Sequence, residues 1–428
     1  MIRVLIATSA GTSHVGKVAP VATELVRRGA EVAWYAGDRY RDAVLATGAR
    51  YLPGSGEALP EMDAIEERHP ELVGMPEHKR GSWWLEHVMV GPAGAQYTEL
   101  SKALREFPAD VVLADSTVLG AGLLHEIEQP LWATLSVAPM AIPDPDVPPY
   151  GPGWQPGSGP LYRLRNALAS RIGEGLMMRD PLRRMNAIRA ELGLVPVRSP
   201  FAANATPYLY LQATTPSFEY PRRELPPQVR FVGPLLPDPP PDFTPPAWWS
   251  ELDRRRAVLV SQGTVATSTG GMVEPAVRAL AGTDLLVVVT GRGTAHLGAL
   301  GDNVRTAEYL PHDALMPKMA AVVTSGGYGT VQLALKHGIP LVTAGATEDK
   351  PEVCARVAWS GAGVFLRGGR PSPQRIAAAV RQVLDDPSYR RRARALADDF
   401  ARHDAPAEIA RLLADLVAEH RQNSPAAG

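Results

Sequence analysis

The sequence has a single cysteine, Cys354, among 428 residues, which excludes an intramolecular disulfide and a cluster of thiolate metal ligands. The net charge of −1 gives the whole chain no attraction for nucleic acid or an anionic membrane. No apolar run approaches the roughly 18 residues of a membrane span, and "MIRVLIATSAG" lacks the basic and apolar regions of a signal peptide. We therefore expect a cytoplasmic protein with no nucleic acid partner and no membrane span. The sequence leaves open whether two copies of the chain form a homodimer.

Proline, in contrast, is abundant, with 41 residues, about twice the usual share. The stretch "VGPLLPDPPPDFTPPAWWSEL" predicts a stiff interdomain linker at residues 232–252. It separates an N-terminal domain at residues 1–231 from a C-terminal domain at 253–428 that includes the terminal helices. A second proline-rich stretch, residues 138–160, follows an expected strand and should form a long loop on the ligand-facing rim.

Short apolar runs alternate with helix-period segments in both halves of a chain that is 45% hydrophobic and 21% charged. The expected strands lie within residues 3–9, 31–37, 50–54, 110–116, 130–137, 257–264, 284–291, 303–310, 320–327 and 339–345. Apolar strands that alternate with helices indicate parallel sheets covered on both faces. We predict an α/β protein with two doubly wound domains facing each other across a cleft. Ligands then bind at the carboxyl ends of the strands.

The segment "VVTSGGYGT", residues 322–330, joins an apolar strand to a helix expected from Val331. Glycines permit positive φ angles and close backbone approach to a ligand. The N–H groups of the first helical turn are unpaired and lie at the positive end of the helix dipole. The pattern fits a diphosphate site without a charged side chain; a tight helix-on-strand turn explains it about equally well. The residues that would form the site are Ser325, Gly326, Gly327, Gly329 and Thr330.

The longer string "VVTSGGYGTVQLALKHGIPLVTAGATEDKPEVCARVAWSGAGV" resembles the donor-binding signature of the family 1 glycosyltransferases. In that family a Thr-His-Gly-Gly turn, a helix, a Gly-Val-Pro strand and an Asp-Gln pair before Pro-Glu-Asn-Ala follow in this order. The upstream "NVRTAEYLPHDALMPKMAAVV" resembles the segment that packs on the nucleotide base, with Tyr309 where the family often has tryptophan. Within the family, the chain is similar to the bacterial macrolide-type enzymes.

The resemblance covers most of the chain and implies a GT-B fold, with acceptor bound mainly by the N-terminal domain and nucleotide-sugar by the C-terminal one. It also implies inverting transfer without a metal ion or other cofactor. The donor-binding residues that it implies are Thr264, Tyr309, Ser325, Gly326, Gly327, Gly329, Thr330, Asp349 and Lys350.

Three positions depart from the family pattern. Ser325 replaces the turn histidine, and Asp349-Lys350 replaces the Asp-Gln pair that holds sugar hydroxyls. The glutamate that commonly binds both ribose hydroxyls falls on Leu333, with Gln332 beside it as a substitute. Loss of that carboxylate slightly favours a deoxyribose, and so a TDP-sugar over a UDP-sugar. Lys350 has two possible roles, a salt bridge with Glu348 or a contact with the diphosphate, and we expect the salt bridge.

Inverting transfer needs a base to remove the acceptor proton, and histidine suits this role because its unperturbed pKa is near neutral. Aligning "GTSHVGKVAP" with the family's Gly-His-Val-Asn-Pro on proline places Lys17 at the histidine. Anchoring on "ELVRRG" instead needs no gap and places His14 there, so we take His14 as the base. A carboxylate usually orients such a base. Asp115, at the end of the run "DVVLADS", matches the family's partner aspartate; its alternative role is a turn or N-cap residue.

The acceptor is expected to be apolar, such as a natural-product aglycone. We expect the acceptor to contact Trp83, Trp84, His87 and Met89, with Met177 and Met178 as further candidates, although apolar residues at helical spacing more often form core. The only Asp-X-Asp string in the cleft half, Asp144 and Asp146, lies between prolines, and we assign it no metal.

The sequence therefore predicts an inverting, metal-independent glycosyltransferase that moves a sugar from a TDP- or UDP-sugar to a hydroxyl of an apolar small molecule. The alternative is a non-catalytic nucleotide-sugar-binding protein or partner subunit that kept the fold. Retention of both His14 and Asp115 favours the enzyme, because a binding protein has no need of a base.

Overall fold

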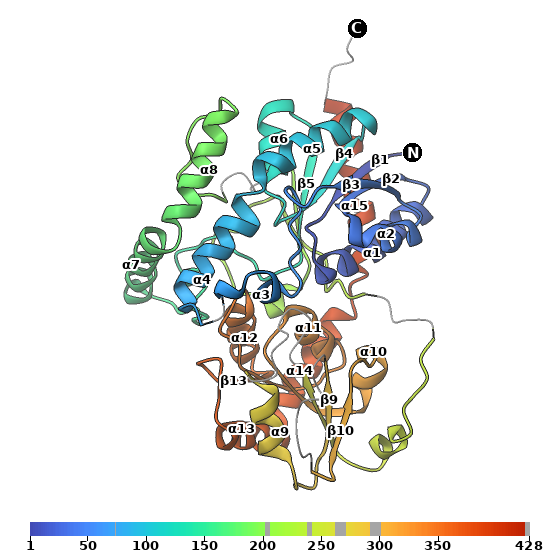
Figure 1. The fold of residues 1–428 in the computed structure, drawn as a ribbon, viewed down its shortest axis with the longest axis vertical. Coiled ribbons are helices and arrows are strands. Elements are labelled where there is room, and N and C mark those ends of the chain that lie inside the picture. The colour runs from blue at the N-terminus through green and yellow to red at the C-terminus, as the bar shows by residue number, and fades with distance from the viewer. Residues whose placement is uncertain (73, 202–205, 238–241, 262–270, 292–300, 424–428) are drawn as a thin grey trace.

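The computed structural model describes residues 1–428 except 73, 202–205, 238–241, 262–270, 292–300 and 424–428. Its two α/β units lie one above the other along the long axis of the molecule (Figure 1). Each unit contains one parallel sheet with helices against its faces. The predicted fold class, two parallel-sheet domains, is confirmed.

In the described part of the chain the N-terminal sheet has seven parallel strands, and β1 lies between β2 and β4. In spatial order its strands are β3 (Arg50–Gly54), β2 (Glu31–Gly37), β1 (Arg3–Ala7), β4 (Val111–Asp115), β5 (Trp132–Ser136), β6 (Leu209–Gln212) and β7 (Val229–Phe231). The helices between them are α1 (Thr12–Arg27), α2 (Arg41–Ala46), α3 (Ile65–Arg68), α4 (Glu77–Trp84), α5 (Ala93–Glu106), α6 (Gly120–Glu128), α7 (Pro160–Leu176) and α8 (Arg179–Glu191).

The C-terminal sheet has six parallel strands among the described residues, and β8 lies between β9 and β11. In spatial order its strands are β10 (Val304–Ala307), β9 (Leu286–Thr290), β8 (Ala257–Ser261), β11 (Met319–Thr324), β12 (Leu341–Thr343) and β13 (Gly363–Phe365). The helices of this half are α9 (Val273–Leu280), α10 (His312–Leu315), α11 (Tyr328–Lys336), α12 (Lys350–Trp359), α13 (Pro373–Asp385) and α14 (Pro387–Phe400).

The strand order creates one switch point in each sheet, because the chain leaves β1 and β8 in one direction and returns beside them at β4 and β11. The connections that follow such neighbouring strands diverge, which opens a crevice at their carboxyl ends. In the N-terminal sheet that crevice lies between the start of α1 and the end of β4. In the C-terminal sheet the turn from β11 to α11 borders it.

The last helix, α15 (Ala405–Asn423), crosses back to the N-terminal domain, where it lies red among blue elements in Figure 1. Ile409, Leu413 and Val417 are buried in the same core cluster as β1 and α1. The sequence placed all terminal helices in the C-terminal domain, but the apolar side of α15 is buried against α1. The chain thus joins the domains twice, once through the linker and once before α15.

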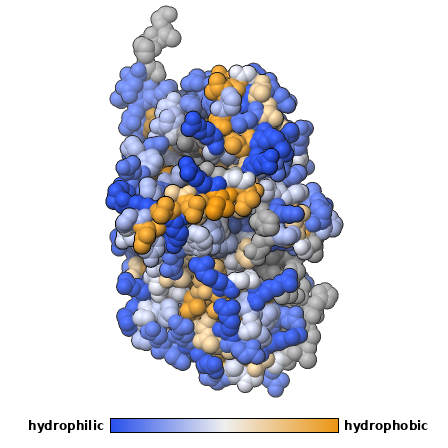
Figure 2. Space-filling view, turned by 90° about the vertical axis from the view of Figure 1, so that its left-hand side faces the viewer, coloured by the Kyte–Doolittle hydropathy of each residue, from blue (hydrophilic) through white to orange (hydrophobic). Residues whose placement is uncertain are grey.

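One helix presents an apolar face to solvent. Figure 2 shows an orange band across the molecule at the height of α7. The exposed apolar side chains of this helix are Leu161, Tyr162, Leu164, Leu168, Ile172 and Leu176.

Within the part of the chain that the structure describes, no helix has the length and apolar character needed to cross a membrane.

Candidate active site between the two domains

His14 and Asp115 meet at the N-terminal switch point. Helix α1 begins at Thr12, so His14 lies in its first turn. Asp115 is the last residue of β4, which pairs directly with β1. Nδ1 of His14 lies 2.5 Å from Oδ2 of Asp115. The His14 side chain is 14% exposed and that of Asp115 fully buried, so only the imidazole can reach a ligand.

Asp115 makes the contact that each of its two predicted roles requires, one on each carboxylate oxygen. Oδ1 accepts hydrogen bonds from the backbone N–H and the hydroxyl of Thr117 at 3.0 and 2.9 Å, which is the turn role. Oδ2 faces His14. Burial alone would raise the pKa of Asp115, but His14 and Thr117 together hold it below its ordinary value. An ionised Asp115 accepts the proton of Nδ1 and leaves Nε2 as the nitrogen that can take a proton from a ligand.

Asp63 holds the turn that carries His14, and sequence reasoning did not identify it. Its Oδ2 accepts a hydrogen bond from the N–H of Thr12 at 3.1 Å and another from the Thr12 hydroxyl. The N-cap residue of α1, Gly11, has no side chain to do this. Asp63 therefore caps α1 from a distant loop. Such a cap leaves no local sequence signal, because it is 51 residues away.

An apolar cluster begins beside His14. A Cβ placed on Gly11 would lie 3.2 Å from the His14 ring and 3.5 Å from Met62, and Met62 packs against buried Ile65, Leu72 and Val88.

Trp83 and Trp84 also pack against this cluster. Trp83 stacks on the ring of His87, with centroids 4.6 Å apart. Met89 packs instead in a cluster with α5 and α8, and Met177 lies over Gly81 of α4. Of the apolar residues considered from the sequence, the two tryptophans share a cluster with Met62, which sequence reasoning missed.

The glycine turn after β11 has two kinds of glycine. Gly326 has φ +92°, and a Cβ there would lie 2.4 Å from Sγ of Cys354, so both backbone conformation and packing on α12 require glycine. Gly327 has φ −58°, and a Cβ there would meet no atom of the described residues within 4 Å. Neither its conformation nor packing against the described part of the chain explains this second glycine, which fits a position that a ligand approaches.

Helix α11 begins at Tyr328, three residues before the expected Val331, so Gly329 and Thr330 belong to its first turn. Ser325 is buried ahead of the turn, and its carbonyl accepts a hydrogen bond from Sγ of Cys354 at 3.7 Å. The N–H groups of a first helical turn have no intrahelical acceptor. They stand at the positive end of the α11 dipole, beside Gly327.

Asp349 and Lys350 open α12. Lys350 is buried and pairs with Glu348, with Thr347 Oγ1 3.3 Å from its Nζ, which is the first of its two predicted roles. Burial raises the pKa of Asp349, and neighbouring Glu348 raises it further, while Lys350, Lys17 and His14 oppose this. The electrostatic interaction of Asp349 with His14 links the C-terminal domain to the candidate base.

The remaining donor-side predictions have different outcomes. Tyr309 follows β10 and is 71% exposed. Leu333 packs in the C-terminal core. Gln332 is buried and donates a hydrogen bond to the carbonyl of Ala213 at 2.7 Å, so its amide joins the two domains instead of facing a ribose. Thr264 lies outside the described residues.

Lys17 belongs to the N-terminal domain and contacts the C-terminal one. It was not among the predicted donor-binding residues. It lies one turn after His14 on α1 and is only 7% exposed. Its Nζ donates to the carbonyl of Val137 at 2.9 Å and lies 5.3 Å from the ring centre of Tyr328 on α11. Burial lowers the pKa of Lys17 to about 8, although Asp349 and Asp115 oppose the shift.

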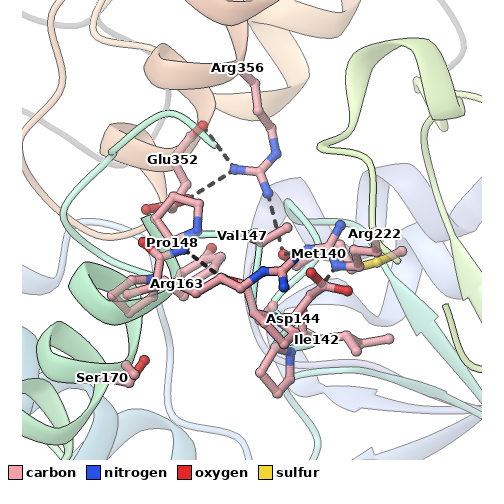
Figure 3. Close-up of a pocket in the computed structure, with 17 residues that line it drawn as sticks. Met140, Ile142, Asp144, Val147, Pro148, Arg163, Ser170, Arg222, Glu352 and Arg356 are labelled. Atoms are coloured by element: carbon pink, nitrogen blue, oxygen red, sulfur yellow. Dashed lines mark hydrogen bonds and ion pairs between the residues drawn. The ribbon is translucent and has the colours of Figure 1, made fainter. Parts of the chain in front are cut away.

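A separate cavity of about 450 Å³ lies under the proline-rich loop (Figure 3). Residues 140–145 and 147–150 line it together with Arg222 and side chains of α7 and α12, and His14 is not among its lining residues. Arg356 reaches into this region from α12, where it pairs with Glu219 at 2.6 Å and Glu352 at 3.0 Å. Glu352 in turn accepts the N–H groups of Gly151 and Gly153. These buried charges hold the loop on α12 and are engaged with one another.

The Asp-X-Asp string is engaged in the same loop. Asp144 accepts hydrogen bonds from the backbone of Asp146 and of Arg223 at 2.8 Å each, and Asp146 pairs with Arg163 at 2.7 Å. Among the described residues, no group of three or more His, Cys, Asp or Glu side chains could hold a metal ion. Both aspartates therefore have structural partners.

Residues 276–416 match the family model of the erythromycin biosynthesis protein CIII-like C-terminal domain. A relative from Lentzea aerocolonigenes described as 4'-demethylrebeccamycin synthase is 44% identical over 422 residues, covering 97% of this chain and 99% of the relative. The chain belongs to the natural-product glycosyltransferases. A UDP-glycosyltransferase 2 from Phaeomoniella chlamydospora is 30% identical over 426 residues, covering 95% and 93%.

Solved glycosyltransferase structures share the whole fold. The calicheamicin glycosyltransferase CalG4 superposes with a TM-score of 0.76 at 22% identity, covering 99% of this chain and all of that one. The Streptomyces sp. SF2575 glycosyltransferase SsfS6 in complex with thymidine diphosphate gives 0.66 at 21% identity, covering 97% and 100%. The GT-B fold predicted for this glycosyltransferase is thereby confirmed.

Proposed function

We propose that this glycosyltransferase inverts the anomeric centre of a TDP- or UDP-sugar as it transfers the sugar to a hydroxyl of an apolar natural product. The observation that carries the proposal is the His14–Asp115 pair. It lies at the N-terminal switch point, and Lys17, one turn further along α1, reaches the glycine turn of the other domain.

In this mechanism His14 Nε2 takes the acceptor proton while the acceptor oxygen attacks the anomeric carbon and the bond to the diphosphate breaks. Asp115 holds the imidazole by Nδ1 and stabilises the imidazolium as it forms. The start of α11 receives the negative charge of the departing diphosphate. A single displacement of this kind needs no covalent enzyme intermediate and therefore inverts the configuration.

The apolar character of the acceptor is supported by the cluster of Met62, Trp83 and Trp84 next to the base. Compounds related to 4'-demethylrebeccamycin, the product in the name of the relative at 44% identity, belong in the first acceptor panel. On the donor side, the family's ribose-binding glutamate is replaced by Leu333, which packs in the core, and the neighbouring Gln332 is bonded to Ala213. We therefore expect TDP to bind more tightly than UDP.

The test compares the wild type with His14→Ala. Transfer should fall by roughly 10²- to 10⁴-fold, the usual contribution of a general base, while calorimetric titration gives unchanged TDP affinity. The product's anomeric configuration, read by NMR, checks inversion, and EDTA should leave the rate unchanged. Full activity in the variant would remove His14 from the mechanism. A wild type that binds nucleotide but transfers no sugar would favour the non-catalytic alternative.

A further inference from the structure

Lys17 is a buried cation that the mechanism above does not use. Only 7% of it is exposed, and its ammonium group makes one hydrogen bond among the described residues, to the carbonyl of Val137. A lysine is seldom buried to this degree unless it is paired. A neutral carbonyl does not balance its charge, so the position calls for an anion.

The side chain ends at the donor turn of the other domain. A Cβ on Gly329, in the first turn of α11, would lie 3.6 Å from Cε of Lys17. The ammonium lies over the ring of Tyr328, the first residue of α11. Lys17 and the α11 dipole therefore place two sources of positive potential at the same point, one from each domain.

The acidic groups that interact with Lys17 are Asp115 and Asp349, and both act at a distance. Asp115 is already engaged by His14 and Thr117. The pKa of Asp349 is raised by burial and by Glu348 and lowered by Lys350 and His14, so this carboxyl group also interacts with other charges. No carboxylate among the described residues forms an ion pair with Lys17 within 4 Å, so its charge is available to a ligand at the turn.

We propose that Lys17 binds the diphosphate of the nucleotide-sugar donor from the N-terminal domain, opposite the first turn of α11. This inference rests on the proposed use of the α11 turn as the donor site. A histidine donor is missing at Ser325, and a lysine from the facing domain supplies the missing positive charge. Because Lys17 belongs to α1, a diphosphate bound in this way contacts both domains beside His14.

This assignment also separates Lys17 from general base chemistry. Its ammonium points at the carboxyl end of β5, through Val137, and at α11, whereas the His14–Asp115 pair faces the apolar cluster around Met62. Lys17 is thus a donor-binding residue, one helical turn from the base.

The experiment measures the dissociation constants of TDP and of thymidine, by calorimetry and by ligand-observed NMR, for the wild type, Lys17→Met and Lys336→Met. Lys336 is the matched control, because it lies at the other end of α11 and pairs with Asp313 at the surface. Lys17→Met should weaken TDP binding by roughly ten- to a hundred-fold, as expected for one hydrogen bond to a charged group, and leave thymidine binding within about two-fold. Lys336→Met should change neither.

Each outcome decides a different point. Equal TDP affinity in the wild type and Lys17→Met would overturn the inference. So would a parallel loss of TDP and thymidine binding, which would mean that Lys17 shapes the site and does not bind the phosphates. If UDP proves the tighter nucleotide, UDP and uridine replace the two probes. A wild type that binds none of the four would refute the donor site itself, and with it the proposed function.

Discussion

Replacement of Asp115 by Asn tests the chemistry of the site with the least structural change. The side chain keeps its shape, and the oxygen that Thr117 contacts at 2.9 and 3.0 Å remains. What is lost is the negative charge 2.5 Å from Nδ1 of His14. The new amide N–H₂ also faces Nδ1, which shifts the imidazole proton to Nε2, the atom that must accept it.

The expected loss follows from the burial of the pair. A hydrogen bond to a charged group contributes about 1.5–3 kcal/mol. Two opposite charges about 4 Å apart at an effective dielectric constant of about 20 interact by about 4 kcal/mol. A transition-state loss of about 2–4 kcal/mol corresponds to a fall in kcat of roughly 30- to 1000-fold.

The assay follows steady-state transfer with TDP affinity measured in parallel, and Asp110→Asn is the control. Asp110 precedes the same strand at its opposite end, where it pairs with Arg421 at 2.6 Å, so its loss should leave kcat unchanged. A kcat of Asp115→Asn within about three-fold of wild type, with TDP binding intact, would show that Asp115 does not stabilise the imidazolium and refute the reasoning.

Four further predictions concern the glycine turn, Lys17 and the domain boundary. Gly326→Ala should lower the free energy of unfolding by about 1–3 kcal/mol, seen as a lower melting temperature, because residue 326 has a φ of +92° and an added methyl group would press on Cys354. Gly327→Ala should melt like the wild type but bind TDP more weakly, since its methyl group enters the donor site. TDP affinity should fall between pH 7 and pH 9 in the wild type, because Lys17 loses its proton near its pKa of about 8. Arg356→Met should destabilise the fold by about 3–5 kcal/mol in thermal unfolding, since buried carboxylates lose their cation.

Each of these has a clear counter-result. Equal melting temperatures for the two glycine variants would show that the turn relaxes around a methyl group at either position. For the pH series, the Lys17→Met variant subtracts any contribution of His14 and Asp349. Asp115 stays ionised because its pKa is lowered, and Tyr328 stays neutral because burial raises its pKa. A parallel pH dependence in wild type and variant would contradict the assignment. An unchanged melting temperature for Arg356→Met would mean that hydration or protonation of Glu219 and Glu352 compensates for the lost guanidinium group.

The sequence by itself determined the architecture and the identity of the main candidate residues. Alternating apolar strands and helices indicated two parallel sheets, because only a strand covered on both faces is apolar throughout. The choice of His14 over Lys17 as the candidate base came from the ungapped alignment anchored on the end of α1. In a helix, the number of residues fixes the distance between two positions, so a gap within it is unfavourable. The order of motifs after β11 indicated the donor turn.

Tertiary structure alone decided which groups act together. Helix periodicity could not show that α15 packs against α1, because the apolar face of an amphipathic helix does not specify which core it packs against. Asp63 caps α1 from a distant loop, and Gln332 turns to Ala213 in the other domain. In the ungapped alignment that places His14 on the family histidine, Lys17 falls on the proline of Gly-His-Val-Asn-Pro, and only the apposition of the domains brings its charge to α11. Contacts between residues far apart in the chain arise from the packing of completed elements, and local sequence patterns do not encode them.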